Sequence, residues 1–178
     1  SSDVLIISKV SSATPEQLAK VRENAQRLNP RATLIEADLA IEIDRSIEGR
    51  RALVVEDGPT VTHGGMAFGA GLRATRDHRG VAIDPRPFAV GTIAEAYARY
   101  PHLGPVLPAL GYSEEQRREL AQTIDRAFAE GHVDVLVDGS PARLSTEIVH
   151  EHPVARVSYR FVQRTGEELA AFIEAALR

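Results

Sequence analysis

Short apolar runs alternate with longer amphipathic stretches along this 178-residue chain, and the alternation predicts strands that are followed by helices. Most of the apolar runs are rich in Val, Ile and Leu, as buried parallel strands are. The predicted strands are residues 4–7, 33–37, 52–55, 81–83, 133–137 and 156–161. Because the last run alternates between apolar and polar residues, we expect it to lie at an edge of the sheet.

Helices are predicted between the strands, where apolar residues recur three and four positions apart. Two of these helices begin with a capping-box pattern, Thr14 with Gln17 and Ser113 with Gln116. The predicted helices are residues 15–28, 66–76, 92–99, 113–131, 142–150 and 166–177.

The alternation of strands and helices predicts an α/β fold in which a mostly parallel sheet is flanked by helices on both faces. Residues 39–50 are interpreted as a connection, and the proline-rich residues 100–108 as a shaped loop. We expect residues 1–178 to form one α/β domain. Since the sequence begins with Ser1 and not with Met, and enters a strand almost at once, we interpret it as a fragment or as a domain cut from a longer protein.

The composition narrows the classes of function. The formal net charge of −4 argues against non-specific nucleic-acid binding. The absence of cysteine excludes disulfides and thiolate metal sites. No apolar run approaches the roughly 20 residues of a membrane span. We therefore expect a cytoplasmic enzyme or binding domain that acts on small molecules.

A cluster of polar residues follows the predicted central strand, residues 52–55, and is the strongest candidate site. Its members are Glu56, Asp57, Thr60, Thr62 and His63, followed by Gly64-Gly65. In open α/β sheets ligands bind beyond the carboxyl ends of the strands, where this loop is expected. Carboxylates suit Mg²⁺, hydroxyls and backbone N–H groups suit phosphate oxygens, and histidine transfers protons near neutral pH. A tight turn with a capping aspartate is the structural alternative.

Polar residues also follow the other predicted strands. They are Lys9, Asp38, Asp84 with Arg86, and Asp138 with Ser140. The carboxyl ends of parallel strands meet along one edge, so we expect these side chains to form a charged crevice there. Arg86 lies between two prolines, which either hold it outward to bind phosphate or carboxylate, or leave it in a structural turn with Asp84.

Three further patterns are weaker. His102 lies in the proline-rich loop, where a structural role competes with substrate binding. Residues 69–74 match the G-x-G-x-x-A spacing but do not follow a strand directly, which favours close packing of a glycine-bearing helix over dinucleotide binding. His150 and His152 have the wrong spacing for a zinc pair on one helical face and are interpreted as a solvated turn.

Four stretches in this order together resemble the cyclic 2,3-diphosphoglycerate synthetase family of P-loop proteins. They are residues 51–66, 84–87, 100–112 and 137–141. The resemblance covers nearly the whole chain. It implies a P-loop NTPase-like, Rossmann-like half, and a ligase that uses ATP and Mg²⁺ to close a phosphorylated acid into an intramolecular phosphoanhydride.

Under this resemblance the polar residues take roles in phosphate chemistry. The catalytic residues are Glu56, Asp57 and His63, with Asp57 as the Mg²⁺ ligand. The residues that bind substrate or phosphate are Thr60, Thr62, Arg86, His102 and Ser140. An alternative makes Glu56 a structural acid paired with an arginine, and the sequence leaves open which of the two acids binds metal.

The sequence departs from the family in two respects. It has no G-x-x-x-x-G-K-[ST] phosphate loop, which in the family lies upstream of the part that this chain resembles. The resemblance therefore implies the C-terminal part of a longer P-loop protein, with a phosphate cradle that comes from elsewhere. Ser8, Lys9 and Ser11 align with the N-K-x-D element that binds the nucleotide base, but Ser11 replaces the aspartate that recognises guanine, which favours ATP over GTP.

The expected partners are a nucleotide, a phosphorylated small-molecule acid, and either a second copy of the chain or the missing N-terminal P-loop region, with no nucleic acid or membrane. Two alternatives belong to other classes. One is a nucleotide-regulated GTPase or metallochaperone-like binding module without cyclising activity. The other is a dimerisation half that associates with a separate P-loop chain.

Overall fold

The computed structural model describes residues 2–62, 67–110, 113–140 and 151–177, with the backbone alone at residues 59 and 60. The chain divides into two compact units. Unit 1 contains residues 1–40 and 159–178, and unit 2 contains residues 41–158. Two long strands, β2 (Thr33–Ile43) and β7 (Val154–Thr165), contribute residues to both units. The expectation that residues 1–178 form one domain of a longer protein stays a prediction.

Unit 1 is built on a parallel pair of strands. In addition to its parts of β2 and β7, it contains β1 (Val4–Ile7), the short 3₁₀ helix η1 (Val10–Ser12), α1 (Pro15–Leu28) and α7 (Leu169–Ala176). β1 pairs with β2 from Val4 opposite Thr33 to Ile7 opposite Glu36. The capping box of Thr14 and Gln17 is present, which confirms the predicted start of α1.

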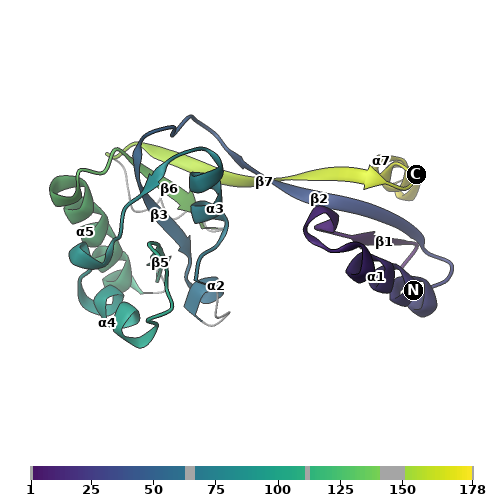
Figure 1. Cartoon of the computed structure of the whole chain (residues 1–178), viewed down its shortest axis with the longest axis horizontal. Helices are drawn as coiled ribbons and strands as arrows, with labels where there is room; N and C mark the ends of the chain where they lie inside the picture. The colour runs from purple at the N-terminus through teal and green to yellow at the C-terminus, as the bar shows by residue number, and fades with distance from the viewer. Residues whose placement is uncertain (1, 63–66, 111–112, 141–150, 178) are drawn as a thin grey trace. The chain divides into compact units, whose positions relative to one another are not determined.

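Unit 2 is built on a parallel sheet whose central strand is β3 (Arg51–Asp57) (Figure 1). Its other strands are β4 (Val81–Ala82), β5 (Leu107–Ala109), β6 (Val135–Gly139) and the start of β7. Its helices are α2 (Gly58–Thr62), α3 (Ala70–Asp77), the 3₁₀ helix η2 (Arg86–Phe88), α4 (Gly91–Arg99) and α5 (Glu114–Gly131). β3 pairs in parallel with β4, β5 and β6, and β6 pairs in parallel with β7.

Each face of this sheet carries its own core, because successive side chains of a strand point to opposite faces. On one face Leu53 and Leu136 pack with Ile93 of α4 and Ile124 of α5. On the other face Val54 and Val137 pack with Leu72 of α3. The alternating cores confirm the predicted α/β fold with a mostly parallel sheet flanked by helices.

Three sequence predictions about strands are wrong. The loop predicted at residues 100–108 ends in strand, because β5 begins at Leu107. The predicted connection 39–50 begins as strand, because β2 continues to Ile43. The strand predicted at an edge is β7, which lies between β2 and β6 in the strand order β1-β2-β7-β6-β3-β4. The alternation of apolar and polar residues in β7 therefore does not mark an edge strand. From Tyr159 onward, β7 carries no fully buried residue. The helix predicted at 142–150 lies outside the described residues.

The remaining predicted elements are present with shifted ends. The helix predicted at 66–76 is α3, which begins at Ala70, and the terminal helix predicted from Gly166 is α7, which begins at Leu169. The second capping box, Ser113 with Gln116, starts α5 as predicted. In the described part of the chain, no helix has both the length and the apolar character needed to cross a membrane.

Candidate functional site

Three strands of unit 2 end side by side, and polar residues lie at these ends. In the register of the sheet Val55 lies opposite Asp138 and Glu56 opposite Gly139, while Asp57 lies opposite Ala109 of β5. Asp138 is 3% exposed, and its Oδ1 accepts hydrogen bonds from the Ser140 backbone N at 3.0 Å and from the Ser140 hydroxyl at 2.6 Å. The prediction that β3 and β6 deliver acids and hydroxyls to one edge is confirmed for these residues.

Asp57 and Asp138 also share a face of the sheet. Asp57 follows Val55 by two residues, and Val55 is the register partner of Asp138. Since strand side chains alternate with a period of two, both carboxylates project from the same face of neighbouring strands. Arg156 of β7 lies opposite Asp138 on the far side of β6. The carboxyl end of the sheet therefore presents two acids and one guanidinium on one face.

Glu56 points to the opposite face and is buried against the start of α3. Its side chain is among the largest fully enclosed ones, at 2% exposure. Its Oε1 accepts hydrogen bonds from the Gly69 backbone N at 3.0 Å and the Leu72 backbone N at 2.8 Å. A helix N-terminus offers unpaired N–H groups and a partial positive charge, so the carboxylate caps α3 from a neighbouring strand.

Glycines make room for this carboxylate. A Cβ at Gly69 would lie 2.6 Å from Glu56 Oε2, one at Gly139 would lie 2.9 Å from the same oxygen, and one at Gly71 would lie 3.1 Å from Oε1. The G-x-G-x-x-A pattern thus serves close packing of a glycine-bearing helix on the sheet, as predicted. Burial raises the pKa of Glu56, while the N–H groups of Leu72, Gly71 and Gly69 act against that rise.

The alternative in which Glu56 is a structural acid fits these contacts, although the partners they show are backbone amides and not the arginine expected from the sequence. The glycine spacing of residues 69–74 is the sequence signal for this arrangement. The spacing does not indicate Glu56 as the partner, because a helix and a loop separate the glycines from Glu56 along the chain.

The residues after Asp57 form the short helix α2. Thr62 is 6% exposed, and its hydroxyl donates to the Gly58 carbonyl at 2.7 Å. Gly58 fits closely against β5, because a Cβ there would lie 2.6 Å from the Ala109 carbonyl oxygen. Thr60 lies on α2, but its side chain is outside the described residues, and so is His63.

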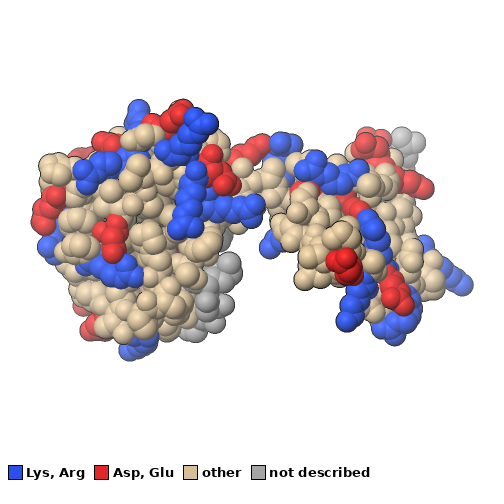
Figure 2. Space-filling model, viewed as in Figure 1, with Lys and Arg blue, Asp and Glu red and all other residues tan. Residues whose placement is uncertain are grey.

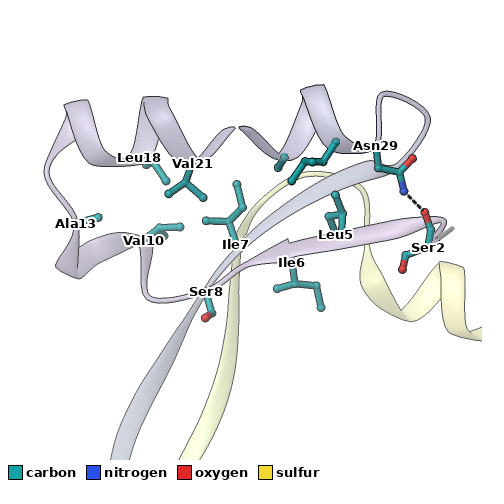
Figure 3. Close-up of a pocket in the computed structure, with 12 residues that line it drawn as sticks. Ser2, Leu5, Ile6, Ile7, Ser8, Val10, Ala13, Leu18, Val21 and Asn29 are labelled. Carbon is teal, nitrogen blue, oxygen red and sulfur yellow. Dashed lines mark hydrogen bonds between the residues drawn. The ribbon is translucent and has the colours of Figure 1, made fainter. Parts of the chain in front are cut away.

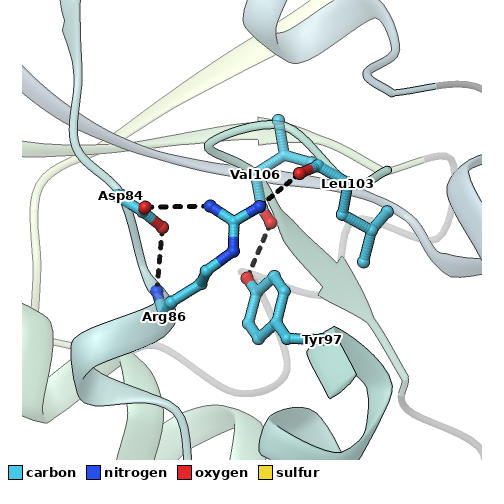
Figure 4. Close-up of polar contacts among 5 residues, drawn as sticks. All are labelled: Asp84, Arg86, Tyr97, Leu103 and Val106. Atoms are coloured by element: carbon cyan, nitrogen blue, oxygen red, sulfur yellow. Dashed lines mark hydrogen bonds and ion pairs between the residues drawn. The ribbon is translucent and has the colours of Figure 1, made fainter. Parts of the chain in front are cut away.

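Arg86 belongs to the structural turn, which was one of the two alternatives left open by the sequence (Figure 4). Its backbone N donates to Asp84 Oδ1 at 3.1 Å and its Nη1 to Asp84 Oδ2 at 2.8 Å. Its Nη2 donates to the Leu103 carbonyl, and its guanidinium lies 5.3 Å from the centre of the Tyr97 ring. Arg86 therefore ties the turn to the 100–106 loop.

Two more contacts hold the same loop. The Tyr97 hydroxyl donates to the Val106 carbonyl at 2.7 Å, and burial raises the pKa of Tyr97 above its ordinary range. His102 Nε2 lies 2.9 Å from the Val61 carbonyl, which connects the loop to α2. This contact fits the structural role that competed with substrate binding for His102.

The expectation that the polar residues after all strands gather along one edge is wrong for Asp38. β4 pairs with Arg51 and Ala52 at the start of β3, and Asp84 follows β4 two residues after Ala82. Asp38 is not at a strand end at all, because it lies inside β2. The expected solvated turn at His152 is also corrected, since its Nε2 lies 2.8 Å from Asp125 Oδ1 and its ring stacks on Phe128; His150 is outside the described residues.

The predicted base-binding residues lie in unit 1. Lys9 has a left-handed backbone with φ 61°, which is uncommon for a residue with a side chain. The Ser11 backbone N donates to Asp38 Oδ1 at 2.9 Å, its hydroxyl donates to Asp38 Oδ2, and Arg164 Nε donates to Oδ2 at 2.7 Å. The Ser11 hydrogen bonds, followed by Arg164, lower the pKa of Asp38 to about 2.

Ser8 borders an apolar cavity of about 610 Å³ between β1 and α1 (Figure 3). Leu5 and Ile7 of the strand and Leu18 and Val21 of the helix form most of its wall. A serine at the rim of an apolar wall is compatible with the flat face of a nucleobase. The base-binding roles of Ser8, Lys9 and Ser11 stay predictions.

Sequence reasoning missed a polar cavity of about 220 Å³ in unit 2. It is bordered by Thr62 of α2, by Glu95 and Arg99 of α4, and by Tyr100 and Gln116. The available signal was the spacing of Glu95 and Arg99, which are four residues apart on a predicted helix. Figure 2 shows acidic and basic side chains interspersed on the visible face of each unit.

The fold and the strand-end residues define an α/β protein with a Rossmann-like, mostly parallel sheet, whose polar residues gather where β3, β5 and β6 end. Over 175 residues, 97% of this chain, the sequence is 45% identical to "Arginine synthetase ArcE" of Thermococcus kodakarensis (strain ATCC BAA-918 / JCM 12380 / KOD1). The chain spans 38% of the length of that relative. No family model matches the chain.

Proposed function

We propose that this chain forms part of a ligase-type synthetase that uses nucleotide-driven phosphoryl transfer to activate a small substrate. The single observation that carries the proposal is the 45% identity to a protein named as a synthetase, which extends over 97% of the chain. The acids and hydroxyls at the ends of β3 and β6 support it, because ligands of open α/β sheets bind at that edge.

The first candidate reaction is the formation of arginine, which the name of the relative favours. A ligase that makes arginine must convert a ureido carbon into a guanidinium carbon. The ureido oxygen of citrulline would take the γ-phosphoryl group of ATP, with release of ADP. Ammonia would then form the new C–N bond at that carbon, and phosphate would leave with the oxygen.

The second candidate is the cyclic 2,3-diphosphoglycerate synthetase reaction. It is favoured by residues 51–66, 84–87, 100–112 and 137–141, which resemble that family. Both reactions begin with a phosphoryl transfer from ATP to a substrate oxygen, and they differ in the group that attacks next. The proposed ligand of the strand ends is thus a phosphoryl group in either case.

Mg²⁺ is the proposed metal, with Asp57 as a ligand and Asp138 on the same face of the neighbouring strand. The described residues contain no cluster of three or more acids or histidines that would form a complete metal site. That pattern fits Mg²⁺, which proteins usually hold through one or two carboxylates together with water and substrate phosphates. When bound, Mg²⁺ would neutralise the charge that develops on the transferred phosphoryl group.

The nucleotide and the loop that holds its phosphates are proposed to come from outside this chain. ATP is the proposed nucleotide, with GTP as the lesser candidate, and a phosphate loop would be supplied by a further region of the same protein or by a partner chain. Thr60, Thr62 and Ser140 are proposed to contact phosphate oxygens and His63 to transfer a proton. A cytoplasmic location and self-association are proposed as well.

Product analysis of the full-length protein that contains this chain tests the proposal. The protein is incubated with ATP and Mg²⁺, either with citrulline and ammonium or with 2,3-diphosphoglycerate, and the products are separated by mass spectrometry. Arginine or the cyclic phosphoanhydride identifies the reaction. ATP hydrolysis with neither product overturns the ligase proposal and favours the nucleotide-regulated binding module.

Asp57→Asn is the variant that tests the proposed metal ligand. Because it removes the charge of a proposed metal ligand, we expect kcat to fall by about a hundredfold or more while the fold is retained. Asp77→Asn is the matched control, since Asp77 lies at the exposed end of α3 with 61% side-chain exposure. Equal turnover of the wild type and Asp57→Asn would remove Asp57 from the chemistry.

A further inference from the structure

The polar cavity of about 220 Å³ in unit 2 has an acid and a base on one wall. Glu95 and Arg99 lie one helical turn apart on α4, so they occupy the same face of that helix. Both are exposed to solvent. Thr62 of α2 and Gln116 of α5 also line the cavity. The cavity therefore combines both signs of charge with neutral polar groups.

The two charged side chains do not form an ion pair with each other. Their order and spacing are favourable for one, because an acid four residues before a base suits the helix dipole. Two other pairs with this spacing do interact, Arg73 with Asp77 at 3.7 Å and Arg126 with Glu130 at 3.4 Å. Within the described contacts, Glu95 and Arg99 have neither a hydrogen bond nor an ion pair.

The wall that carries these two side chains is held in place from both ends. The Thr92 backbone N and hydroxyl donate to Glu119 Oε2 of α5 at 2.9 Å and 2.5 Å. The Tyr97 hydroxyl donates to the Val106 carbonyl at 2.7 Å. Ile93 is fully buried against the core. The positions of Glu95 and Arg99 on the cavity are thus fixed by packing, which limits the reorganisation that binding requires.

We propose that this cavity binds the α-amino-acid end of the substrate, with Arg99 on the carboxylate and Glu95 on the ammonium group. The proposal rests on the proposed function and names its substrate class as a free amino acid. A guanidinium matches a carboxylate because its fork donates to both oxygens, and a carboxylate accepts from an ammonium group.

The position of the cavity is consistent with the site at the strand ends. Thr62 borders the cavity and lies five residues after Asp57, at the end of α2. At the rise of an α-helix this separation corresponds to about 7.5 Å. An amino acid held at the cavity by its α-groups would extend its side chain along α2 toward Asp57. The reacting carbon of an arginine-sized substrate lies at the far end of such a side chain.

Binding measurements on the full-length protein by isothermal titration calorimetry, without ATP, test the proposal. The probes are L-arginine, agmatine, which lacks the carboxylate, and 5-guanidinopentanoate, which lacks the α-amino group. L-arginine is expected to bind at least about tenfold more tightly than either analogue, because each analogue leaves one charged side chain without its partner. Equal binding of the three probes, or binding of none at millimolar concentration, would overturn the proposal.

Substitutions assign each contact. Arg99→Gln is expected to weaken the binding of L-arginine by about tenfold or more and to leave that of agmatine unchanged. Glu95→Gln is expected to weaken the binding of L-arginine likewise and to leave that of 5-guanidinopentanoate unchanged. Arg126→Gln and Glu130→Gln on α5 are matched controls that leave all three probes unchanged. An equal loss for L-arginine and agmatine in Arg99→Gln contradicts the assigned role. If the protein binds L-arginine selectively but shows no ligation, the proposed function is wrong and the proposed amino-acid site stands.

Discussion

Glu56 lies in an environment that is unusual for a glutamate. It is 2% exposed, and burial raises its pKa above the ordinary value of a glutamate. The N–H groups at the start of α3 favour the charged form and only partly offset the burial. A carboxyl group of this kind binds a proton more readily in the folded than in the unfolded chain.

Glu56 should therefore make stability fall as pH rises. In the window from about pH 4.3, the ordinary glutamate pKa, up to the raised pKa of Glu56, the folded state binds more protons than the unfolded state. Stability from this group is complete below that window and is lost as pH rises through it. Glu56→Gln keeps the acceptor oxygen and cannot titrate, so its free energy of unfolding lacks this decline.

Urea denaturation of both proteins at a series of pH values measures the difference. The free energy of unfolding of Glu56→Gln minus that of the wild type is expected to increase with pH across the window. Glu48→Gln, at an exposed position of unit 2, is the control for the general effect of removing a carboxylate. Parallel pH profiles of the wild type and Glu56→Gln would show that Glu56 has an ordinary pKa in the folded protein.

At this scale the sequence predicted which residues are polar and follow strands, but not which way they point. Glu56 and Asp57 are adjacent, and alternation of a strand sends one toward α3 and the other toward the α5 face. The outcome for Arg86 depended on the positions of Leu103 and Tyr97, which the spacing of the sequence does not give. Local spacing fixes neighbours within one element, whereas these contacts join separate elements.

Among the elements, α3 approaches the sheet most closely through its glycines. A Cβ at Gly71 would lie 2.9 Å from Val54 Cγ1 and 3.1 Å from Glu56 Oε1. Gly71→Ala should therefore displace α3 from β3 and destabilise the protein by about 1–3 kcal/mol, although alanine is the better helix former.

Chemical denaturation of Gly71→Ala measures this effect, with Arg73→Ala on the same helix as the control. Arg73 is 62% exposed, so its replacement should change stability by less than about 0.5 kcal/mol. A Gly71→Ala protein as stable as the wild type would mean that α3 tolerates a wider separation from the sheet.

Elements were predicted well where the sequence carries a local signal. The capping boxes at Thr14 and Ser113 gave two helix starts correctly, because the side-chain and backbone groups that satisfy each other lie three residues apart. The length of β2 and the interior position of β7 were missed. Strand pairing joins residues far apart in the sequence, and it decides where a strand ends and whether it lies at an edge.

The two units of the molecule differ in how much of each is buried. In unit 2 the residues from Ala52 to Glu56 are all buried, and both faces of the sheet carry a core. Among the described residues of unit 1, the buried ones are Ile35, Glu36, Ala37 and Asp38 of β2. Helix α1 has no buried residue. Local stability follows the density of buried contacts, so the units should open at different free energies.

Hydrogen exchange measured by mass spectrometry or NMR on the 178-residue chain tests this difference. Amides of β3 and β6 are expected to exchange most slowly, and those of α1 at least about a hundredfold faster, since few buried apolar contacts oppose the opening of α1. Val21 on α1 is 47% exposed, which leaves the contact between α1 and β1 incomplete. Equal protection of α1 and β3 would show that the chain opens as one cooperative unit despite this difference in burial.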